Sequence, residues 1–242
     1  MPSVAELTSL YTNVLLNPRS GPGVCETCFT FTDGYQRCYP CQRAERTLDI
    51  VAPISYSVAG EQLHHALAGY KRLGGDVARR MQVDMAALLW RYLADHEHCI
   101  AAGAGVPFFT TVTTVPSSSR GRDERHPLRH IVGKLVLPTR DRFARLLTRS
   151  DAAVDDRTIS TEKYVATHTL SGEPVLLIDD TWTTGANAQS AAATLRQAGA
   201  GPIALVVIGR HIRRDWEDND QRLRALPRPF DWADCAWHAS GS

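Results

Sequence analysis

The sequence predicts an α/β fold, in which helices flank a central, mostly parallel sheet and a small zinc-binding module comes first. The runs at 175–178 and 201–209 are apolar without alternation, as is typical of parallel strands covered on both faces. Helix-forming stretches separate such runs along the chain, which indicates alternating strands and helices. Four closely spaced cysteines near the N-terminus predict the metal-binding module.

The other elements follow from hydrophobic periodicity and from turn signals. Apolar residues at Val4, Leu7, Leu10, Val14 and Leu15 would form one face of an amphipathic helix. In chain order we expect that helix within 1–17, a strand at 49–58, helices at 62–70 and 76–96, a strand at 108–115, a short helix at 127–136, a strand from 175, a helix at 187–197 and a strand at 201–209.

Two domains are expected, an N-terminal helix with the cysteine module at 1–47 and an α/β domain at 48–242. The module contains two Cys-x2-Cys pairs, and four thiolates suit a tetrahedral structural zinc site. Its metal ligands would be Cys25, Cys28, Cys38 and Cys41. A segment this short builds no core of its own, so we expect metal loss to unfold it. Because the two domains are separate, we expect ligand binding in the second domain mostly to survive.

Disulfides and a four-cysteine iron–sulfur cluster are the alternatives to zinc. The first residues of the chain lack a basic region, a clean apolar segment and a small-residue cleavage site. We therefore expect a reduced, cytoplasmic protein, in which zinc is favoured over disulfides. No stretch of 18 apolar residues is present, so we expect no membrane attachment.

The stretch 175–187 predicts a ligand site. Asp179 and Asp180 follow the apolar strand directly, and ligands of open α/β sheets bind outside the carboxyl ends of the strands. The next residues form a small turn before a helix, where unsatisfied backbone N–H groups and the helix dipole bind phosphate. These loop residues are Thr183, Thr184, Gly185, Ala186 and Asn187. Paired carboxylates beside an anion site predict a phosphorylated polyol as ligand.

A nucleoside-triphosphate site of the P-loop kind does not fit, because the chain contains no GxxxxGK[ST] motif. The run VLLIDDTWTTGAN instead resembles the phosphoribosyl-pyrophosphate (PRPP) signature of type I phosphoribosyltransferases. In that family two acids hold the ribose hydroxyls, and a TTG-type loop holds the 5′-phosphate. The chain departs from the family pattern at Asn187, where Thr or Ser is usual, and at Thr181 and Trp182, where aliphatic residues are usual.

The double Cys-x2-Cys module together with this run resembles the ComF/GntX-like phosphoribosyltransferase family, which is associated with competence and DNA uptake. The resemblance implies a type I phosphoribosyltransferase fold. It also places Lys71 at the basic position of a Tyr/Phe-Lys segment, and 112–121 at the loop that faces pyrophosphate. The family's RGFNQ continuation is absent, since Arg120 and Gly121 are followed by RDERHPL.

The resemblance implies a role for each candidate residue. Asp179 and Asp180 would hold the ribose, and the 183–187 loop would hold the 5′-phosphate. Ser118, Ser119 and Arg120 would bind the departing pyrophosphate together with Mg²⁺. Asp179, Asp180 and Arg120 are the expected catalytic residues. The polar stretch 149–163 would be a mobile loop, whose Arg157 and Lys163 close over pyrophosphate. An ordinary exposed loop is the alternative for this stretch.

The expected reaction transfers phosphoribose from Mg-PRPP to an unidentified base or amine, with release of pyrophosphate. The alternative is a non-catalytic DNA-uptake or nucleic-acid-binding protein that uses the PRPP pocket as a ligand sensor. A formal net charge of +1 and the lack of a long basic run give no independent sign of nucleic acid. The sequence leaves open whether the protein forms a homodimer.

Two further groups of metal-binding side chains occur in the sequence, His96-Glu97-His98-Cys99 and Cys235-x2-His238. A histidine-rich helix end is commonly solvated, and cysteine is often simply buried. We therefore expect no second metal site. The tail from Asp215 is rich in Trp, Pro and Arg, and its fold is not predicted.

Overall fold

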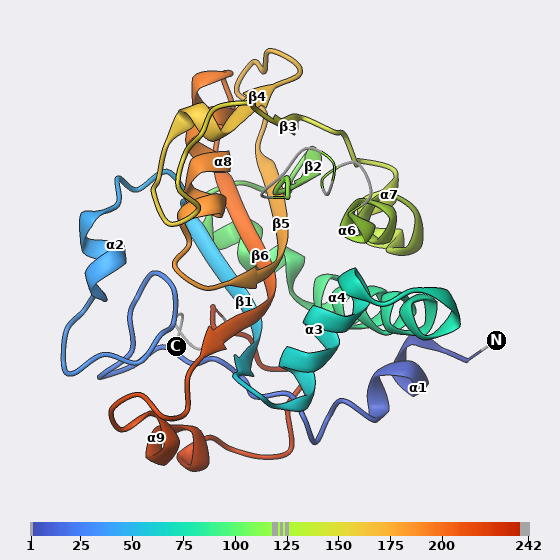
Figure 1. Ribbon diagram of the computed structural model, residues 1–242, viewed down its shortest axis with the longest axis vertical. Helices are drawn as coiled ribbons and strands as arrows, with labels where there is room; N and C mark the ends of the chain where they lie inside the picture. Colours follow the sequence, from blue (N-terminus) through green and yellow to red (C-terminus); the bar gives the residue numbers. More distant parts are fainter. Residues whose placement is uncertain (1, 118–120, 122, 124–125, 238–242) are drawn as a thin grey trace.

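The structure is a computed structural model that describes residues 2–117, 121, 123 and 126–237. Its centre is a parallel sheet of four strands in the order β1-β6-β5-β2 (Figure 1). These strands are β1 (Ile50–Val58), β2 (Thr111–Thr114), β5 (Val175–Trp182) and β6 (Ile203–Ile212). Helices cover both faces, so the prediction of a parallel sheet flanked by helices is confirmed.

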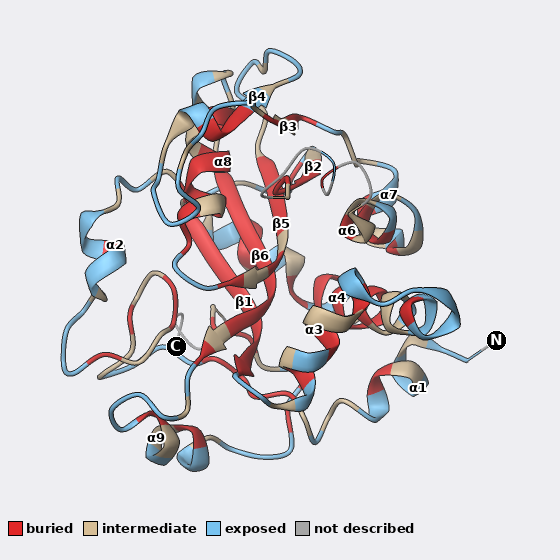
Figure 2. Cartoon of the chain, viewed as in Figure 1, coloured by how far each residue is buried: buried red, intermediate tan, exposed pale blue. Residues whose placement is uncertain are grey.

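Alternate residues of each strand point to opposite faces of the sheet and enter two different apolar clusters. On β6, Ala204, Val206 and Ile208 pack on one face, while the residues between them pack on the other. The strands are therefore buried on both sides, as Figure 2 shows for β1, β5 and β6. Double burial is the reason that the runs 175–178 and 203–208 are apolar without alternation.

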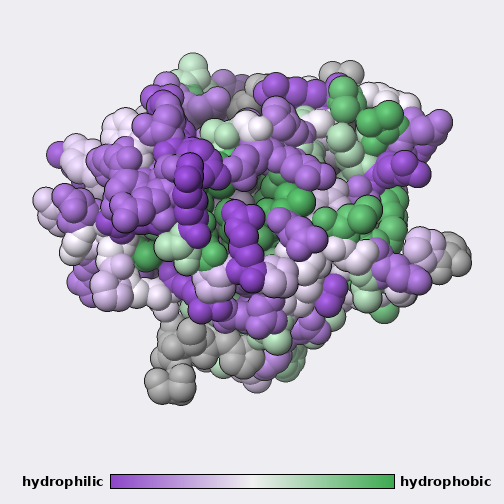
Figure 3. Space-filling view, turned by 90° about the horizontal axis from the view of Figure 1, so that it is seen from below, coloured by the Kyte–Doolittle hydropathy of each residue, from purple (hydrophilic) through white to green (hydrophobic). Residues whose placement is uncertain are grey.

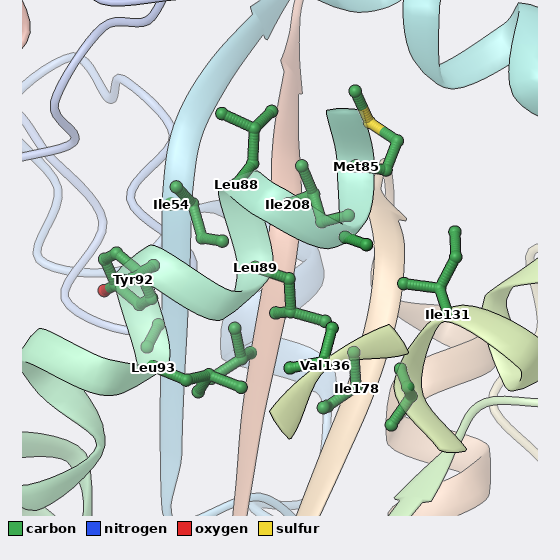
Figure 4. Packing of buried hydrophobic residues seen from close by; sticks show 14 of the residues in the cluster. Ile54, Met85, Leu88, Leu89, Tyr92, Leu93, Ile131, Val136, Ile178 and Ile208 are labelled. Carbon is green, nitrogen blue, oxygen red and sulfur yellow. The ribbon is translucent and has the colours of Figure 1, made fainter. Parts of the chain in front are cut away.

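The larger cluster lies between the sheet and the long helix α4. Leu88, Leu89 and Leu93 of α4 pack against Ile54, Ile208 and Ile178 of the central strands (Figure 4). The helices of this face are α3 (Gln62–Arg72), α4 (Gly75–Gly103), α6 (Pro127–His130), the π-helical turn η1 (Ile131–Leu135) and α7 (Leu137–Arg140). Truncation of one such leucine to alanine typically costs about 2–5 kcal/mol.

On the opposite face α8 (Ala186–Gln197) packs with small side chains, and the cysteine module lies next to it. Cys25, Cys28 and Cys41 belong to the same apolar cluster as Val51 and Leu205 of the sheet. The predicted boundary between residues 47 and 48 stays a prediction. The remaining elements are α1 (Val4–Ser9), α2 (Tyr39–Arg43), β3 (Leu147–Arg149), η2 (Thr161–Lys163), β4 (Tyr164–Ala166) and α9 (Asn219–Ala225).

The helix predicted within 1–17 is present, but its predicted apolar face extends beyond it, because α1 ends at Ser9. Leu10, expected on the buried face, is 81% exposed. Beyond the helix the backbone bonds to β1 instead: the N–H of Leu16 donates to Ser55 Oγ at 2.8 Å, and the N–H of Tyr56 donates to the Leu16 carbonyl at 3.0 Å. These long-range bonds override the helical periodicity.

Other boundaries differ in ways that affect the chemistry. Helix α4 continues to Gly103 instead of ending near residue 96, so His96 lies inside the helix and is 2% exposed. The expectation of a solvated helix end there is wrong. Strand β6 continues to Ile212, which places Arg210 within the sheet. The face seen from below is mostly hydrophilic, with apolar groups gathered in its centre and at one side (Figure 3).

Candidate functional site

The candidate site lies where the connections of two neighbouring strands run to opposite faces of the sheet. After β2 the chain leads to α6 on the α4 face, and after β5 it leads to α8 on the other face (Figure 1). Such a divergence opens a crevice at the carboxyl ends of the strands. A cavity of about 470 Å³ occupies it, and one of about 640 Å³ lies beside it. Asp179, Thr181 and Asn187 line both cavities.

Asp180 faces the first cavity but is already bound by protein groups. Its Oδ2 accepts hydrogen bonds from the Tyr70 hydroxyl and from Lys71 Nζ, the latter at 2.5 Å. His126 Nε2 lies 3.6 Å from the same oxygen. Burial acts to raise the pKa of Asp180, but Lys71 and His126 outweigh it and hold the pKa below its usual value. Asp180 is therefore a carboxylate that positions the end of α3.

Asp179 lies in a different environment from its neighbour. It is half-buried, and its Oδ1 accepts the backbone N–H of Asp180 at 2.9 Å. Desolvation, followed by the charge of Asp180, raises the pKa of Asp179 to about 8. Two adjacent acids are thus driven to different protonation states, a condition that is common at functional sites.

The loop before α8 is shaped by Gly185, whose φ is +82°. A Cβ atom on Gly185 would come 2.1 Å from Cζ2 of Trp182, whose ring is buried at 3% exposure. Glycine is therefore required both for the backbone conformation and for the indole beneath it. Trp182 stands where the resembled family usually has an aliphatic residue. Its ring packs under the 183–187 loop, against Gly185.

Arg210 sets the orientation of the same loop. Its Nη1 donates to the carbonyl oxygens of Trp182 and Thr183, each at 3.2 Å. In a trans peptide the N–H of the next residue points opposite to the carbonyl. The N–H groups of Thr183 and Thr184 are therefore directed away from Arg210. Together with the first amides of α8 they make this loop suited to an anion.

Asn187 lines both cavities, and a buried lysine fixes its side chain. Lys163 Nζ donates to Asn187 Oδ1 at 3.0 Å and to the Asp156 carbonyl at 2.9 Å. Lys163 is 0% exposed, so the expectation that it closes over pyrophosphate from a mobile loop is wrong. Arg157 does line the second cavity from that loop. The amide group of Asn187 keeps its N–H donors for a ligand.

The predicted pyrophosphate residues Ser118, Ser119 and Arg120 lie outside the described residues. Asp123, a described residue that follows them in the chain, is 2% exposed. Asp123 accepts the Ser117 N–H at 3.0 Å and forms ion pairs with Arg129 and with Arg145, the latter at 3.2 Å.

Sequence analysis missed three residues of this region, Asp123, His126 and Tyr70. Tyr70 stands directly before Lys71, so the Tyr/Phe-Lys resemblance was a signal for it. No local pattern indicated Asp123 or His126, because their partners come from other elements.

The four cysteines of the N-terminal module come together as predicted. Their sulfur atoms all lie within 4.8 Å of one another, and those of Cys28 and Cys38 are 3.6 Å apart. A disulfide needs about 2.05 Å, whereas a tetrahedral zinc ion with bonds of about 2.3 Å holds its sulfurs about 3.8 Å apart. Hydrogen bonds from the other three thiols hold the pKa of Cys25 well below its usual range. The cluster therefore has the spacing to hold a single structural metal such as zinc.

The cysteine module and the 183–187 loop are directly connected. Arg210 Nε donates to the Cys28 carbonyl at 2.9 Å, while the same guanidinium binds the carbonyls of Trp182 and Thr183. Arg210 Nη2 also lies 3.6 Å from Cys28 Sγ. This bridge joins the metal module to the ligand loop, which the sequence analysis treated as parts of two separate domains.

Comparison with known proteins gives no match, either to a family model or to a curated protein. Among the helices in the described part of the chain, none combines the length and the apolar character of a membrane span.

Proposed function

We propose that this chain is a phosphoribosyltransferase-like protein of the type I fold, similar to the ComF/GntX-like family. It would transfer phosphoribose from Mg-PRPP to a base or amine and release pyrophosphate. The observation that supports this best is that Asp179 lines two neighbouring cavities, one at the 183–187 loop and one between α3 and the segment after β2. A ligand with a phosphate at one end, hydroxyls in the middle and pyrophosphate at the other end matches this arrangement.

In this proposal each part of the site has one task. The loop amides and Asn187 bind the 5′-phosphate at the start of α8. Asp179 accepts the ribose hydroxyls, and Asp180 keeps Lys71 at the rim of the first cavity. Ser118, Ser119 and Arg120 bind the pyrophosphate.

The reaction breaks the bond between C1 of the ribose and the pyrophosphate oxygen, while the acceptor nitrogen bonds to C1. Positive charge develops on the ribose and negative charge on the leaving group. Arg120 and Lys71 would stabilise the leaving group by charge. Mg²⁺ arrives with PRPP and neutralises part of the pyrophosphate charge. Cys25, Cys28, Cys38 and Cys41 would hold zinc in a structural role, which fits a reducing, cytoplasmic setting.

A second candidate is a PRPP-binding sensor without turnover, which would act in nucleic-acid uptake or binding. The observation that favours it is the state of Asp180, whose Oδ2 is bound by both Tyr70 and Lys71. Only Asp179 of the pair would then meet the ribose directly. Binding would persist in this case, but the charge arrangement for catalysis would be incomplete.

The deciding experiment measures Mg-PRPP binding by calorimetry and pyrophosphate release across a panel of bases. Single-stranded DNA binding is measured in parallel at a stated salt concentration. At a pH above the raised pKa of Asp179, which is about 8, we expect Asp179→Asn to weaken Mg-PRPP binding by about 1–3 kcal/mol, the range for loss of a charge-assisted hydrogen bond. Asp141→Asn is the matched control, because that carboxylate is exposed and lines neither cavity.

Unchanged binding in the Asp179 variant would refute the assignment of the site. Binding without pyrophosphate release, together with affinity for single-stranded DNA, would favour the sensor over the enzyme.

A further inference from the structure

Three metal-binding side chains from two distant parts of the chain meet beside α4. His96 and Cys99 lie one turn apart on the same face of α4. Cys235 comes from the C-terminal segment that follows α9. One ligand atom from each of these three residues lies within 4.8 Å of the other two. This geometry resembles that of the four-cysteine cluster, but it is formed by residues that are far apart in sequence.

Two of the three residues are buried, whereas Cys99 is partly exposed. His96 is 2% exposed and Cys235 is 3% exposed, and Cys235 belongs to the main apolar cluster. Burial of an imidazole and thiols among apolar side chains is costly unless each polar atom is satisfied. A shared metal ion would bind one donor atom from each of the three residues.

The histidine ring is held in an orientation that suits a ligand. His96 Nε2 lies 2.7 Å from the carbonyl oxygen of Trp232. A carbonyl only accepts, so Nε2 bears the proton, and in the neutral ring Nδ1 then has the lone pair. Metal-binding histidines typically donate their other N–H to a carbonyl in this way.

Two neighbouring side chains, Tyr92 and His98, contact residues of the cluster. Tyr92, which lies on the same helix (Figure 4), packs against the His96 ring with the centroids 4.9 Å apart. Its hydroxyl is buried and has no hydrogen-bond partner among the described residues. His98 Nε2 lies 3.2 Å from Cys99 Sγ.

The C-terminal segment 226–237 contains neither helix nor strand, so its position depends on side-chain contacts. Side chains hold it at several points. The Asp231 N–H donates to Asn17 Oδ1 at 2.9 Å, and the Arg91 guanidinium lies 4.3 Å from the centroid of the Trp232 ring. A metal bound between Cys235 and α4 would close a long loop, which restricts the unfolded chain.

We propose that His96, Cys99 and Cys235 bind a second zinc ion, which fastens the C-terminal segment to α4. One imidazole and two thiolates are a donor set that zinc prefers. His238 follows Cys235 at the spacing of a Cys-x2-His pair in the sequence, and it lies outside the described residues. The site is independent of the proposed transferase function.

The test is native mass spectrometry of the full chain, purified under reducing conditions, with zinc counted per chain. We expect about two zinc ions in the parent and about one in Cys235→Ser and in His96→Ala. Cys25→Ser removes a ligand of the first cluster and should keep the second ion. His98→Ala is the matched control, because it changes a neighbouring histidine outside the three-residue cluster and should retain both ions.

Cobalt reconstitution gives a second measurement if a variant folds poorly. The parent with two cobalt ions should lose part of its thiolate-to-metal absorption in Cys99→Ser. A parent with a single zinc ion that Cys25→Ser removes and Cys235→Ser retains would overturn the proposal. A disulfide between Cys99 and Cys235 in the reduced protein would also overturn it, as would loss of the second ion in His98→Ala but not in His96→Ala.

Discussion

At the scale of single residues, the adjacent carboxyl groups of Asp179 and Asp180 have different surroundings and therefore different chemical properties. Asp180 is paired with Lys71 and lies close to His126, whereas Asp179 forms no ion pair within the described part of the chain and lies next to a like charge. The pKa of Asp179 is therefore raised to about 8, which means that its ionised form is disfavoured in the folded protein.

This difference predicts how stability depends on pH. Between its unfolded pKa of about 3.9 and its folded pKa of about 8, folded Asp179 holds more proton than the unfolded chain. Its contribution to stability therefore falls as pH rises through that window. We expect Asp179→Asn to gain stability relative to the parent between pH 5 and pH 8, measured by urea unfolding. A difference that stays constant with pH would contradict the raised pKa.

A second residue-scale prediction concerns Gly185 and the indole of Trp182 below it. Gly185→Ala should destabilise the protein by about 1–3 kcal/mol, because it adds a Cβ in a left-handed conformation against the ring. It should also weaken binding of ribose 5-phosphate. In a Trp182→Leu background the cost should shrink, since the overlapping ring atoms are gone.

The measurement is a double-mutant cycle by chemical denaturation. The part of the cost that is due to the positive φ should remain in both backgrounds. Equal costs with and without the indole would show that the ring contact is not the cause.

At the scale of elements, the 150–163 loop is attached to α8 rather than projecting freely. The Ser160 N–H donates to Ser190 Oγ at 3.0 Å, and Thr194 Oγ1 donates to the Thr161 carbonyl at 3.3 Å. Lys163 adds its bonds to Asn187 and to the Asp156 carbonyl. The loop and the start of α8 therefore behave as one unit around the second cavity.

Lys163→Met tests this attachment, because it keeps the length of the side chain and removes the donor. We expect amide hydrogen exchange over 155–163 to rise about tenfold, which corresponds to about 1.4 kcal/mol of local opening. Arg157→Met is the matched control, since Arg157 is exposed in the same loop and should leave exchange unchanged. A similar rise in both variants would count against the role of the buried lysine.

At the scale of the whole molecule, one guanidinium connects the cysteine module, the sheet and the ligand loop. Arg210 lies on β6 and is 6% exposed. Its acceptors include the carbonyls of Cys28, Trp182 and Thr183. A change at the metal cluster should therefore reach the loop through this side chain.

We expect Arg210→Lys to lower the affinity for ribose 5-phosphate about tenfold, because a lysine does not replace the fork of donors. Cys25→Ser should lose zinc and show a similar loss of affinity. Arg196→Lys is the control, since Arg196 also bonds backbone carbonyls, those of Thr47 and Gly201, away from the loop. The measurements are calorimetry and zinc content. Normal affinity in zinc-free protein would show that the two sites are independent.

Much of the candidate site could be predicted because it is local in sequence. The apolar run, the two acids and the glycine turn lie within 175–187, and the four cysteines lie within 25–41. Residues this close in the chain stay close in any fold that forms the strand and the helix. The parallel sheet was predictable for a similar reason, since burial on both faces requires strands without polar alternation.

By itself, then, the sequence determined the four strands of the parallel sheet, the glycine turn before α8 and the four-cysteine cluster. Only the tertiary structure decided which groups surround them. Tyr70 and Lys71 reach Asp180 from α3, Arg210 joins Cys28 to the loop, and His96 meets Cys235 across most of the chain. It also ended the first helix at Ser9, where contacts with β1 replaced helical bonds. Periodicity and spacing describe neighbours along the chain, whereas these contacts depend on the order in which strands and helices pack.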